Sequence, residues 1–251
     1  MHISALYRYP VKGLSADKLS QVHLKKDHGF AFDRFWALES GAHDFDPDNP
    51  KFLPKRRFLQ LAQNPKLAQL RCRFDENAQT LTISHNKQQL ICADMTTPQG
   101  HQEIEHCIAG FMEDETHGAP RLVSAPEHHF SDIPQKAVSL INTASVDEIS
   151  QAAGKKVSPL RFRGNVYIEG IEPWAEMDWR GKTLNLDGEP FFEVFDITGR
   201  CPATKVNLHN GERDVDMLNL LNTAFGHTNC GVYMRVINDG QIREGATLTV
   251  A

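Results

Sequence analysis

The residue of this chain that is best placed for chemistry is Cys201, in the segment Asp196-Ile-Thr-Gly-Arg-Cys-Pro-Ala-Thr-Lys205. It follows a strand-like apolar run over residues 191–195 through a turn that contains glycine, and the proline after it disfavours helix. Arg200 and Lys205 favour the thiolate, the form of cysteine that attacks carbon or sulfur and binds soft metals. The segment therefore predicts an exposed, reactive thiol at a strand end. The alternative is a buried cysteine that packs as a small hydrophobic residue.

Basic side chains that can bind an anion occur in two other segments. Arg34 lies in residues 31–38, where alternating side chains predict a strand. It either faces an anionic ligand or lies at the edge of the core, paired with Asp33. Residues 161–165 read Arg-Phe-Arg-Gly-Asn, which places two guanidinium groups and an amide within five residues. This set suits the recognition of an oxygen-rich anion by several hydrogen bonds.

A third possible anion site follows the predicted strand over residues 137–141. Asn142 or Thr143 can cap a helix that Gly154 would end. The free N–H groups of the first helical turn and the hydroxyls of Thr143 and Ser145 can hold a phosphate. Helix capping alone explains the same residues equally well.

The cysteines do not form a recognisable zinc or iron–sulfur motif. The chain has five, an odd number that is widely spaced, and contains no Cys-x-x-Cys pair. This excludes a zinc ribbon, a thioredoxin-type redox pair and a ferredoxin-type cluster, and it predicts reduced thiols. The predicted helix over residues 100–111 carries His, Glu and Cys without the His-Glu-x-x-His spacing of a zinc site, so a solvated face is expected. Electrons for redox chemistry would then come from another polypeptide.

Charge and hydropathy restrict the partners. The formal net charge of −5 argues against a general nucleic-acid binder, which needs a basic face to neutralise phosphates. The N-terminal segment lacks the apolar core of a signal peptide, and no stretch approaches the roughly 18 apolar residues of a membrane span. We therefore expect a cytoplasmic protein that binds neither nucleic acid nor membrane.

The elements that must position these residues are mostly short strands separated by turns. A linker rich in His and Pro covers residues 124–134, and a domain boundary is expected there. The glycine spacing in the second half is typical of a closed or nearly closed β-barrel. Strands are predicted at residues 3–9, 11–13, 19–24, 31–38, 67–74, 80–84, 89–93, 137–141, 166–168, 183–186, 191–195, 203–207, 231–237 and 247–250, and helices at 100–111, 142–154 and 215–222.

Six separated segments occur in an order that resembles MOSC-domain proteins with an N-terminal MOSC β-barrel domain. They are Tyr9-Pro-Val-Lys-Gly13, Asp33-Arg-Phe-Trp36, Ala144-Ser145, Phe162-Arg-Gly-Asn165, Gly199-Arg-Cys201 and Gly240-Gln-Ile-Arg-Glu-Gly245. This family includes the mitochondrial amidoxime-reducing component, its bacterial relatives and the C-terminal domain of molybdenum cofactor sulfurase. The resemblance implies a mainly β (α+β) fold with a few short helices, in which an N-terminal β-barrel-like domain, residues 1–123, packs on a C-terminal MOSC β-barrel, residues 124–251.

The resemblance also implies a molybdenum–molybdopterin cofactor (Moco) held between the two domains. Cys201 would coordinate the metal and would be the catalytic residue, since a thiolate is a soft ligand. Residues that match the family motifs would hold the phosphate and the ring atoms, and arginine suits this role because its fork meets two phosphate oxygens at once. These cofactor-binding residues are Lys12, Arg34, Thr143, Ser145, Arg163, Asn165 and Arg200.

The reductase members of the family remove oxygen from N-hydroxylated substrates, so the resemblance implies an oxidoreductase that acts on small N-hydroxylated compounds. The chain ends after the second barrel, without the ferredoxin domain that is fused to some bacterial relatives. We therefore expect a separate electron-transfer protein of the ferredoxin, flavodoxin or cytochrome type. Asp196, Thr204 and His227 are the candidates for proton transfer near the cysteine.

Departures from the family pattern keep other functions open. Gly13 replaces a serine that is usual in related reductases, Gly164 replaces a proline, and Cys230 is an additional cysteine. One alternative is a sulfur-carrier module in which Cys201 holds a persulfide for metal–sulfur cluster or cofactor assembly. Another is a carrier that binds Moco without turnover. A cysteine hydrolase that pairs Cys201 with a downstream histidine fits no local signature.

Overall fold

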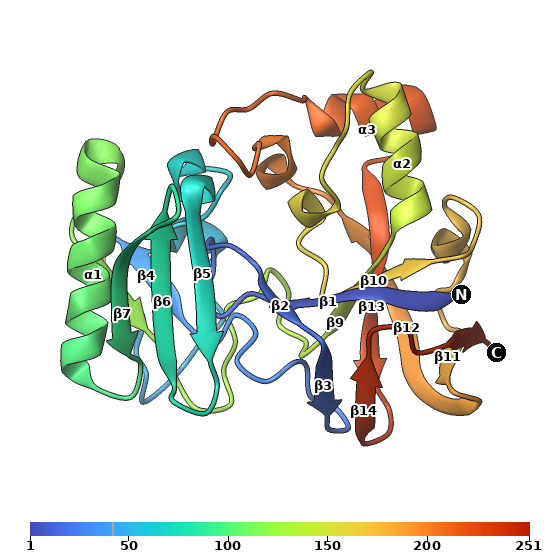
Figure 1. Ribbon diagram of the computed structural model, residues 1–251, viewed down its shortest axis with the longest axis horizontal. Helices are drawn as coiled ribbons and strands as arrows, with labels where there is room; N and C mark the ends of the chain where they lie inside the picture. Colours follow the sequence, from blue (N-terminus) through green and yellow to red (C-terminus); the bar gives the residue numbers. More distant parts are fainter. Residues whose placement is uncertain (42) are drawn as a thin grey trace.

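The computed structural model describes residues 1–41 and 43–251 of the protein. Figure 1 shows two β-rich regions side by side, with both chain ends on the same side of the molecule. The first region holds β4 to β8 and α1, and the second holds β9 to β15, α2 and α3. The elements are β1 (His2–Arg8), β2 (Asp17–Leu19), β3 (Gln21–Leu24), β4 (Ala37–Ser40), β5 (Leu70–Asp75), β6 (Thr80–His85), β7 (Gln88–Asp94), α1 (Pro98–Met112), β8 (Pro120–Val123), β9 (Val138–Asn142), α2 (Thr143–Ala152), β10 (Val166–Glu169), β11 (Thr183–Leu186), β12 (Glu189–Gly199), α3 (Met217–Phe225), β13 (Asn229–Val236), β14 (Gly240–Arg243) and β15 (Leu248–Val250).

One mixed sheet of eight strands forms the second region. Its strand order is β15-β11-β12-β13-β9-β10-β1-β2, in which β9 and β10 are parallel and the other neighbours are antiparallel. A bridge between His2 and Thr247 joins β1 to the residues just before β15, so the sheet nearly closes on itself. Its inner face carries fully buried apolar side chains, among them Leu6, Val194 and Val232. The expected mainly β architecture is therefore confirmed.

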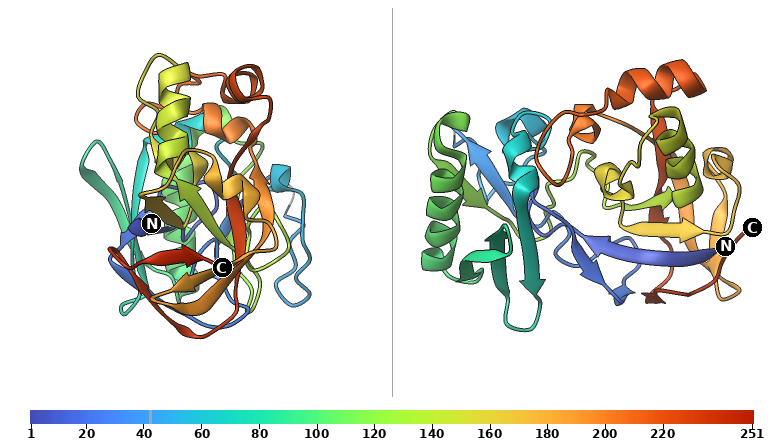
Figure 2. Two further views of the ribbon diagram at one scale, coloured as in Figure 1. Left: turned by 90° about the vertical axis from the view of Figure 1, so that its right-hand side faces the viewer. Right: turned by 45° about the horizontal axis from the view of Figure 1, so that its top comes forward.

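The first region is built from short antiparallel sheets around a second apolar core. β5, β6 and β7 form a meander, and β4 pairs with β8. In β5 the buried residues Leu70, Cys72 and Phe74 alternate with exposed ones, as a strand with one buried face requires. α1 contributes Ile104 and Ile108, which lie one turn apart on its buried face. Figure 2 shows this helix along the outer side of the region.

Strands, ion pairs and the linker join the two regions. β1 pairs with β10, and β3 pairs with β14, so strands from the start of the chain complete sheets of the second region. Arg8 at the end of β1 is buried and forms ion pairs with Asp17 (Nη2–Oδ2 3.0 Å) and Glu76 (Nη1–Oε2 2.7 Å). Residues 130–133 of the linker line the seam between the regions.

Most expected elements are present with shifted ends, but three expected strands are wrong. Residues 31–34 form turns in which Phe32 and Arg34 have positive φ, Trp36 makes a single bridge to Val11, and only the last two residues of the expected strand enter β4. Residues 202–205 form a 3-10 helix, η6, because Pro202 at its first position favours a helical turn over a strand. The expected strand at 11–13 is also wrong, since it makes only a single bridge through Val11. The expected strand over residues 67–74 is present as β5 but begins at Leu70, because residues 67–69 belong to a 3-10 helix, η2 (Pro65–Gln69). β8 and β14 were not predicted.

Candidate functional site

Most of the predicted site residues line one cavity between the two regions. It has a volume of about 420 Å³ and is bounded by the turn after β1, the linker and the end of β12. The predicted residues that line it are Lys12, Arg34, Arg163, Asn165, Arg200 and Cys201. The first two come from the N-terminal region and the other four from the C-terminal region, so the cavity forms only when both regions are folded together.

Cys201 lies just after the end of β12. It is half-buried, lines the cavity and is free of disulfide bonding. Its carbonyl oxygen accepts hydrogen bonds from the backbone N–H (3.1 Å) and Oγ1 (2.9 Å) of Thr204, which hold the backbone of the η6 turn. The structure thus favours the accessible thiol over the buried alternative for Cys201. Cys230 is fully buried instead, and burial raises the pKa of its thiol to about 12.

Arg200, next to the cysteine, connects two chain segments at the cavity wall. Its Nε donates to the carbonyl of Cys230 (2.7 Å), which Nη2 also contacts, and its Nη1 donates to the carbonyl of Phe162 (2.8 Å). Gly231 allows this approach, because a Cβ at that position would lie 2.2 Å from the carbonyl oxygen of Leu140 and 3.2 Å from Nη2 of Arg200. Since its acceptors are neutral carbonyls, the guanidinium keeps its positive charge for a ligand.

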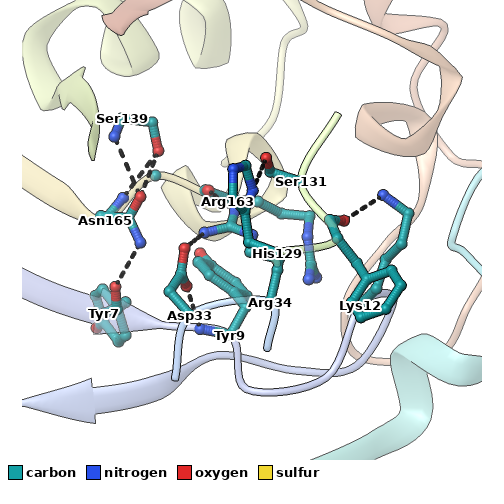
Figure 3. A network of polar contacts seen from close by, with 12 residues as sticks. Tyr7, Tyr9, Lys12, Asp33, Arg34, His129, Ser131, Ser139, Arg163 and Asn165 are labelled. Atoms are coloured by element: carbon teal, nitrogen blue, oxygen red, sulfur yellow. Dashed lines mark hydrogen bonds and ion pairs between the residues drawn. The ribbon is translucent and has the colours of Figure 1, made fainter. Parts of the chain in front are cut away.

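Arg34 and Arg163 lie against the ring of Tyr9, as Figure 3 shows. Arg34 forms an ion pair with Asp33 and donates from Nη2 to the carbonyl of Arg163 (2.7 Å). Arg163 donates from Nη1 to the carbonyl of Leu14 (2.8 Å). Burial and the charge of Arg34 lower the pKa of Arg163. Arg34 therefore combines both interpretations that the sequence left open, because it pairs with Asp33 and also lines the cavity.

Lys12 and Lys55 share one carboxylate, that of Asp132. Lys12 Nζ donates to Asp132 Oδ1 (2.7 Å) and to the carbonyl of Phe130 (2.8 Å), and Lys55 Nζ donates to Asp132 Oδ2 (3.2 Å). Burial opposes ionisation of Asp132, but the two ammonium groups outweigh it and hold the pKa of this carboxyl below its usual value. Burial lowers the pKa of Lys12, although Asp132 opposes the effect. Burial also acts to lower the pKa of Lys55, but Asp132 and the thiol of Cys201 outweigh it and raise this pKa. Lys55 lines the same cavity as Cys201.

Thr143 and Ser145 lie outside this cavity, contrary to the prediction. Thr143 Oγ1 donates to the carbonyl of Ile168 (3.1 Å), and Ser145 Oγ donates to the buried carboxylate of Glu176 (2.8 Å). Asn142 Oδ1 accepts from the N–H of Ala144 (3.1 Å) and caps α2. The protein itself therefore satisfies these polar groups, which favours the capping interpretation.

Asn165 lines the cavity, but its side chain forms hydrogen bonds with two strands of the protein. Oδ1 accepts from the backbone N–H (3.1 Å) and Oγ (2.9 Å) of Ser139, and Nδ2 donates to the carbonyl of Tyr7 (3.1 Å), as drawn in Figure 3. These bonds join β1 to β9 at the floor of the site. Asn165 therefore positions the elements around the cavity.

Two of the three candidates for proton transfer lie in the cavity, and the third does not. Asp196 and Thr204 line the cavity with Cys201. His227 does not: its ring packs 5.0 Å from that of Trp174, and its Nδ1 accepts from the N–H of Asn229 (3.2 Å). Packing of this kind leaves His227 as a structural residue.

The charge and the polar atoms of the cavity suit an anionic ligand with several hydrogen-bonding groups. Six basic and three acidic side chains line it, in a chain whose net charge is −5. Thr198 also lines it and is only 2% exposed, and its Oγ1 has no hydrogen-bond partner among the residues that the structure describes. A buried polar atom without a partner costs about 1–3 kcal/mol. A ligand that pairs with this hydroxyl would recover that energy.

Sequence reasoning missed four residues of the site: Lys55, Asp132, Thr198 and Tyr233. The sequence offered weak signals for two of them, since Lys55 begins a run of three basic residues after Pro54, and Asp132 lies in the linker taken as a domain boundary. Tyr233 lies in β13 and lines the cavity. Burial raises its pKa, although the charge of Arg200 opposes this, so its hydroxyl is protonated at neutral pH.

Protein-family models match both regions of the chain. Residues 1–119 match the MOSC N-terminal beta barrel domain, and residues 125–249 match the MOSC domain. Together the two matches cover almost the whole sequence. The chain therefore belongs to the MOSC-domain family and carries the N-terminal β-barrel domain of that family.

The chain is also similar to individual proteins of known name. The chain is 22% identical to the molybdenum cofactor sulfurase of Homo sapiens over 269 residues, which cover 92% of this chain and 30% of the relative. It is 33% identical to the molybdenum cofactor sulfurase of Anopheles gambiae over 93 residues, which cover 36% of this chain and 12% of the relative. The chain thus spans less than a third of the length of these relatives. Among solved structures, the YuaD protein from Bacillus subtilis aligns with a TM-score of 0.44 and 10% identity, over 99% of this chain and 94% of that chain.

Within residues 1–41 and 43–251, no helix is both long enough and apolar enough to cross a lipid bilayer.

Proposed function

We propose that the protein binds the molybdenum–molybdopterin cofactor in the cavity between its two domains and uses it to reduce small N-hydroxylated compounds. The observation that carries this proposal is the convergence of an accessible thiol, Cys201, with six basic side chains from both domains. The bound cofactor would supply two-electron oxygen-transfer chemistry at its metal, which amino-acid side chains cannot supply.

The lining residues fit the parts of such a cofactor. The Cys201 thiolate is a soft ligand suited to molybdenum. Arg34 and Arg163 place guanidinium groups in the cavity wall, and this group suits a phosphate because it carries several charged N–H donors. Arg200 donates only to neutral carbonyls in its described hydrogen bonds, so its charge also favours an anion. The unpaired hydroxyl of Thr198 offers a hydrogen bond to a ring atom.

Two protons and two electrons are consumed when an N–O bond is reduced to N–H and water. We assign the proton donor of the cavity to Tyr233, because its hydroxyl is protonated at neutral pH and its residue lines the same cavity as Cys201. Asp196 has an exposed carboxylate at the rim and can exchange protons with solvent. The electrons would come from a separate protein of the ferredoxin, flavodoxin or cytochrome type.

A second candidate function is sulfur transfer, and the similarity to molybdenum cofactor sulfurases favours it. In this function Cys201 holds a persulfide that is delivered to a metal–sulfur cluster or a cofactor. A persulfide needs only an accessible thiol. The basic residues Arg34 and Arg163 would then have no ligand to bind, which is why cofactor binding is the first proposal.

The test is to purify the full chain from a host that makes the cofactor and to measure molybdenum, pterin and the reduction of an amidoxime by reduced dye. We expect metal and pterin in similar amounts and turnover in the wild type. Cys201→Ser should lose metal and activity, whereas Cys92→Ser, which changes an exposed thiol outside the cavity, should keep both.

Three outcomes contradict the proposal in different ways. Protein without molybdenum and pterin, even after reconstitution, removes cofactor binding. Protein that holds the cofactor without turnover is a carrier. A labile sulfur adduct on Cys201 in metal-free protein, detected by mass spectrometry, establishes the sulfur-transfer function instead.

A further inference from the structure

A second cavity adjoins the first at Arg163. It has a volume of about 370 Å³ and lies between residues 13–16 of the N-terminal domain and residues 156–163 and 207–209 of the C-terminal domain. Gly13, Leu61, Arg161 and Arg163 line both cavities, so the two spaces are neighbours. The function proposed above makes no use of the second cavity.

The lining of the second cavity is basic. Its cationic residues are Arg71, Lys156, Arg161 and Arg163, and no carboxylate is among the described residues that line it. Arg71 donates to the carbonyls of Ala68 (2.6 Å) and Leu208 (2.7 Å), which are neutral acceptors. Lys156 is exposed, and its ammonium group makes no hydrogen bond or ion pair within the part of the chain that the structure describes. Positive charge gathered in one cavity of a chain with a net charge of −5 favours an anionic ligand.

Arg161 supplies an independent indication of a ligand. Its side chain is 4% exposed, and its Nη1 and Nη2 bind the carboxylate of Asp214 at 2.7 and 3.0 Å. Its Nε has no acceptor among the described residues. A buried donor without an acceptor is unfavourable, so an oxygen atom from a molecule in the adjoining cavity would complete the hydrogen bonding of Arg161.

The remaining lining is largely apolar. Leu14 and Leu61 are buried, and Leu160 and Leu208 are half-buried with surface available to the cavity. Arg71 and Lys156 have no carboxylate partner among the described residues. An apolar wall next to these two cations suits a molecule that combines a flat or apolar body with a phosphate, and the volume lies in the range of small-ligand sites.

We propose that the second cavity is a binding site for a nucleoside monophosphate group. Lys156 and Arg71 bind the phosphate, and the base packs against Leu160 and Leu208. This proposal does not rest on the function proposed above, because it requires neither molybdenum nor Cys201. The group arrives either as a free nucleotide or as the phosphorylated end of a larger molecule that also enters the first cavity.

The test is calorimetric titration of the full chain, purified without cofactor, with AMP, GMP and CMP and with adenosine and inorganic phosphate as probes. We expect a nucleotide to bind more tightly than adenosine or phosphate. Lys156→Ala should weaken this binding by about fivefold or more, as expected for the loss of a charged contact to phosphate. Lys182→Ala, which changes an exposed lysine outside both cavities, should leave the affinity unchanged. Lys55→Ala, which alters only the first cavity, should also leave it unchanged.

The outcomes separate this proposal from its alternatives. Nucleotides that bind no more tightly than inorganic phosphate would overturn it. Binding that weakens in Lys55→Ala but not in Lys156→Ala would also overturn it, because the ligand would then lie in the first cavity. Mass spectrometry of molecules released from denatured protein distinguishes a free nucleotide from the end of a larger ligand. Nucleotide affinity that is unchanged in Cys201→Ser supports this site even if the molybdenum proposal fails.

Discussion

Arg163 of the C-terminal domain packs on the ring of Tyr9 of the N-terminal domain, with its guanidinium carbon 4.3 Å from the ring centroid. Arg34 lies at the same distance, 4.3 Å, from the same centroid. Tyr9 is only 1% exposed, so the ring is a fixed support that two cations share. Like charges repel in a site of low polarity, and contact with the negative face of an aromatic ring offsets part of that repulsion.

Replacing this ring should loosen the site and the fold together. Tyr9→Leu removes both ring contacts and part of a buried side chain, and we expect it to lower the free energy of unfolding by about 2–4 kcal/mol. Tyr9→Phe keeps the ring and loses only the contact between its hydroxyl and that of Tyr167 (3.5 Å), so it should cost about 1 kcal/mol or less. Unfolding in urea measures the free energy of unfolding of both variants. If both variants lowered the free energy of unfolding equally, the ring would not support the arginines.

Arg163→Ala should weaken cofactor retention without unfolding the protein. The variant removes a guanidinium group whose described hydrogen bond goes to the Leu14 carbonyl. We expect retained molybdenum after gel filtration to fall by about tenfold, as for loss of a charge-assisted contact. Arg235→Ala, which removes an exposed arginine paired with Glu193, is the matched control. Unchanged retention in Arg163→Ala would argue against a role in binding phosphate.

The thiols should differ strongly in reactivity. Cys201 lines the cavity and is half-buried, whereas Cys230 is fully buried and its pKa is raised to about 12 by burial. Because the thiolate is the reactive form, iodoacetamide at neutral pH should alkylate Cys201 in the folded protein and spare Cys230 until urea is added. Peptide mass spectrometry measures the extent at each site. Early alkylation of Cys230 would contradict the burial described for it.

Asp132 should make the fold more stable above the ordinary titration range of aspartate than below it. Lys12 and Lys55 overcome burial and hold the pKa of this carboxyl below its usual value. The carboxylate is therefore favoured in the folded chain, and its contribution is fully present above about pH 4 and is lost as the pH falls through the lowered folded-state value. The difference in unfolding free energy between wild type and Asp132→Asn should therefore narrow from pH 6 to pH 3. Asp48→Asn, at an exposed loop position, should show no such trend.

Gly231 should be the least replaceable glycine near the site. Its φ is +78°, and a Cβ there would lie 2.2 Å from the Leu140 carbonyl oxygen. We expect Gly231→Ala to cost more than about 3 kcal/mol or to prevent folding, through strain and clash. Gly110→Ala in α1 meets open space and should stabilise by about 0.5–1 kcal/mol. Thermal unfolding compares the two, and similar melting temperatures would contradict this packing.

The sequence predicted Cys201 because its signals are local. An apolar strand, a glycine and a proline determine where a thiol is presented, and all three lie within a few residues of it. The position of Arg34 was found by the same kind of reasoning, but its expected strand was wrong. The turn there depends on Asp33, whose Oδ1 accepts from the N–H of Tyr9 (2.8 Å), a residue 24 positions away. The alternation of polar and apolar side chains cannot reveal a hydrogen bond between residues so far apart in the sequence.

The remaining differences also depend on distant partners. Capping and phosphate binding require the same residue types at a helix start, and only the carboxylate of Glu176, 31 positions downstream, shows how Ser145 is used. Lys55 and Asp132 belong to no motif. They join the site because the linker folds back across the seam between the two regions. No periodic pattern in the sequence predicts that path of the chain.

The pairing of β1 has a consequence for how the protein is made. His2 to Leu6 find their partners in residues 166–169, and His2 also bridges Thr247. During translation β1 therefore cannot complete its pairing until residues 166–169 and Thr247 have left the ribosome. The barrel closes late, because strands that are far apart in the sequence meet at its seam.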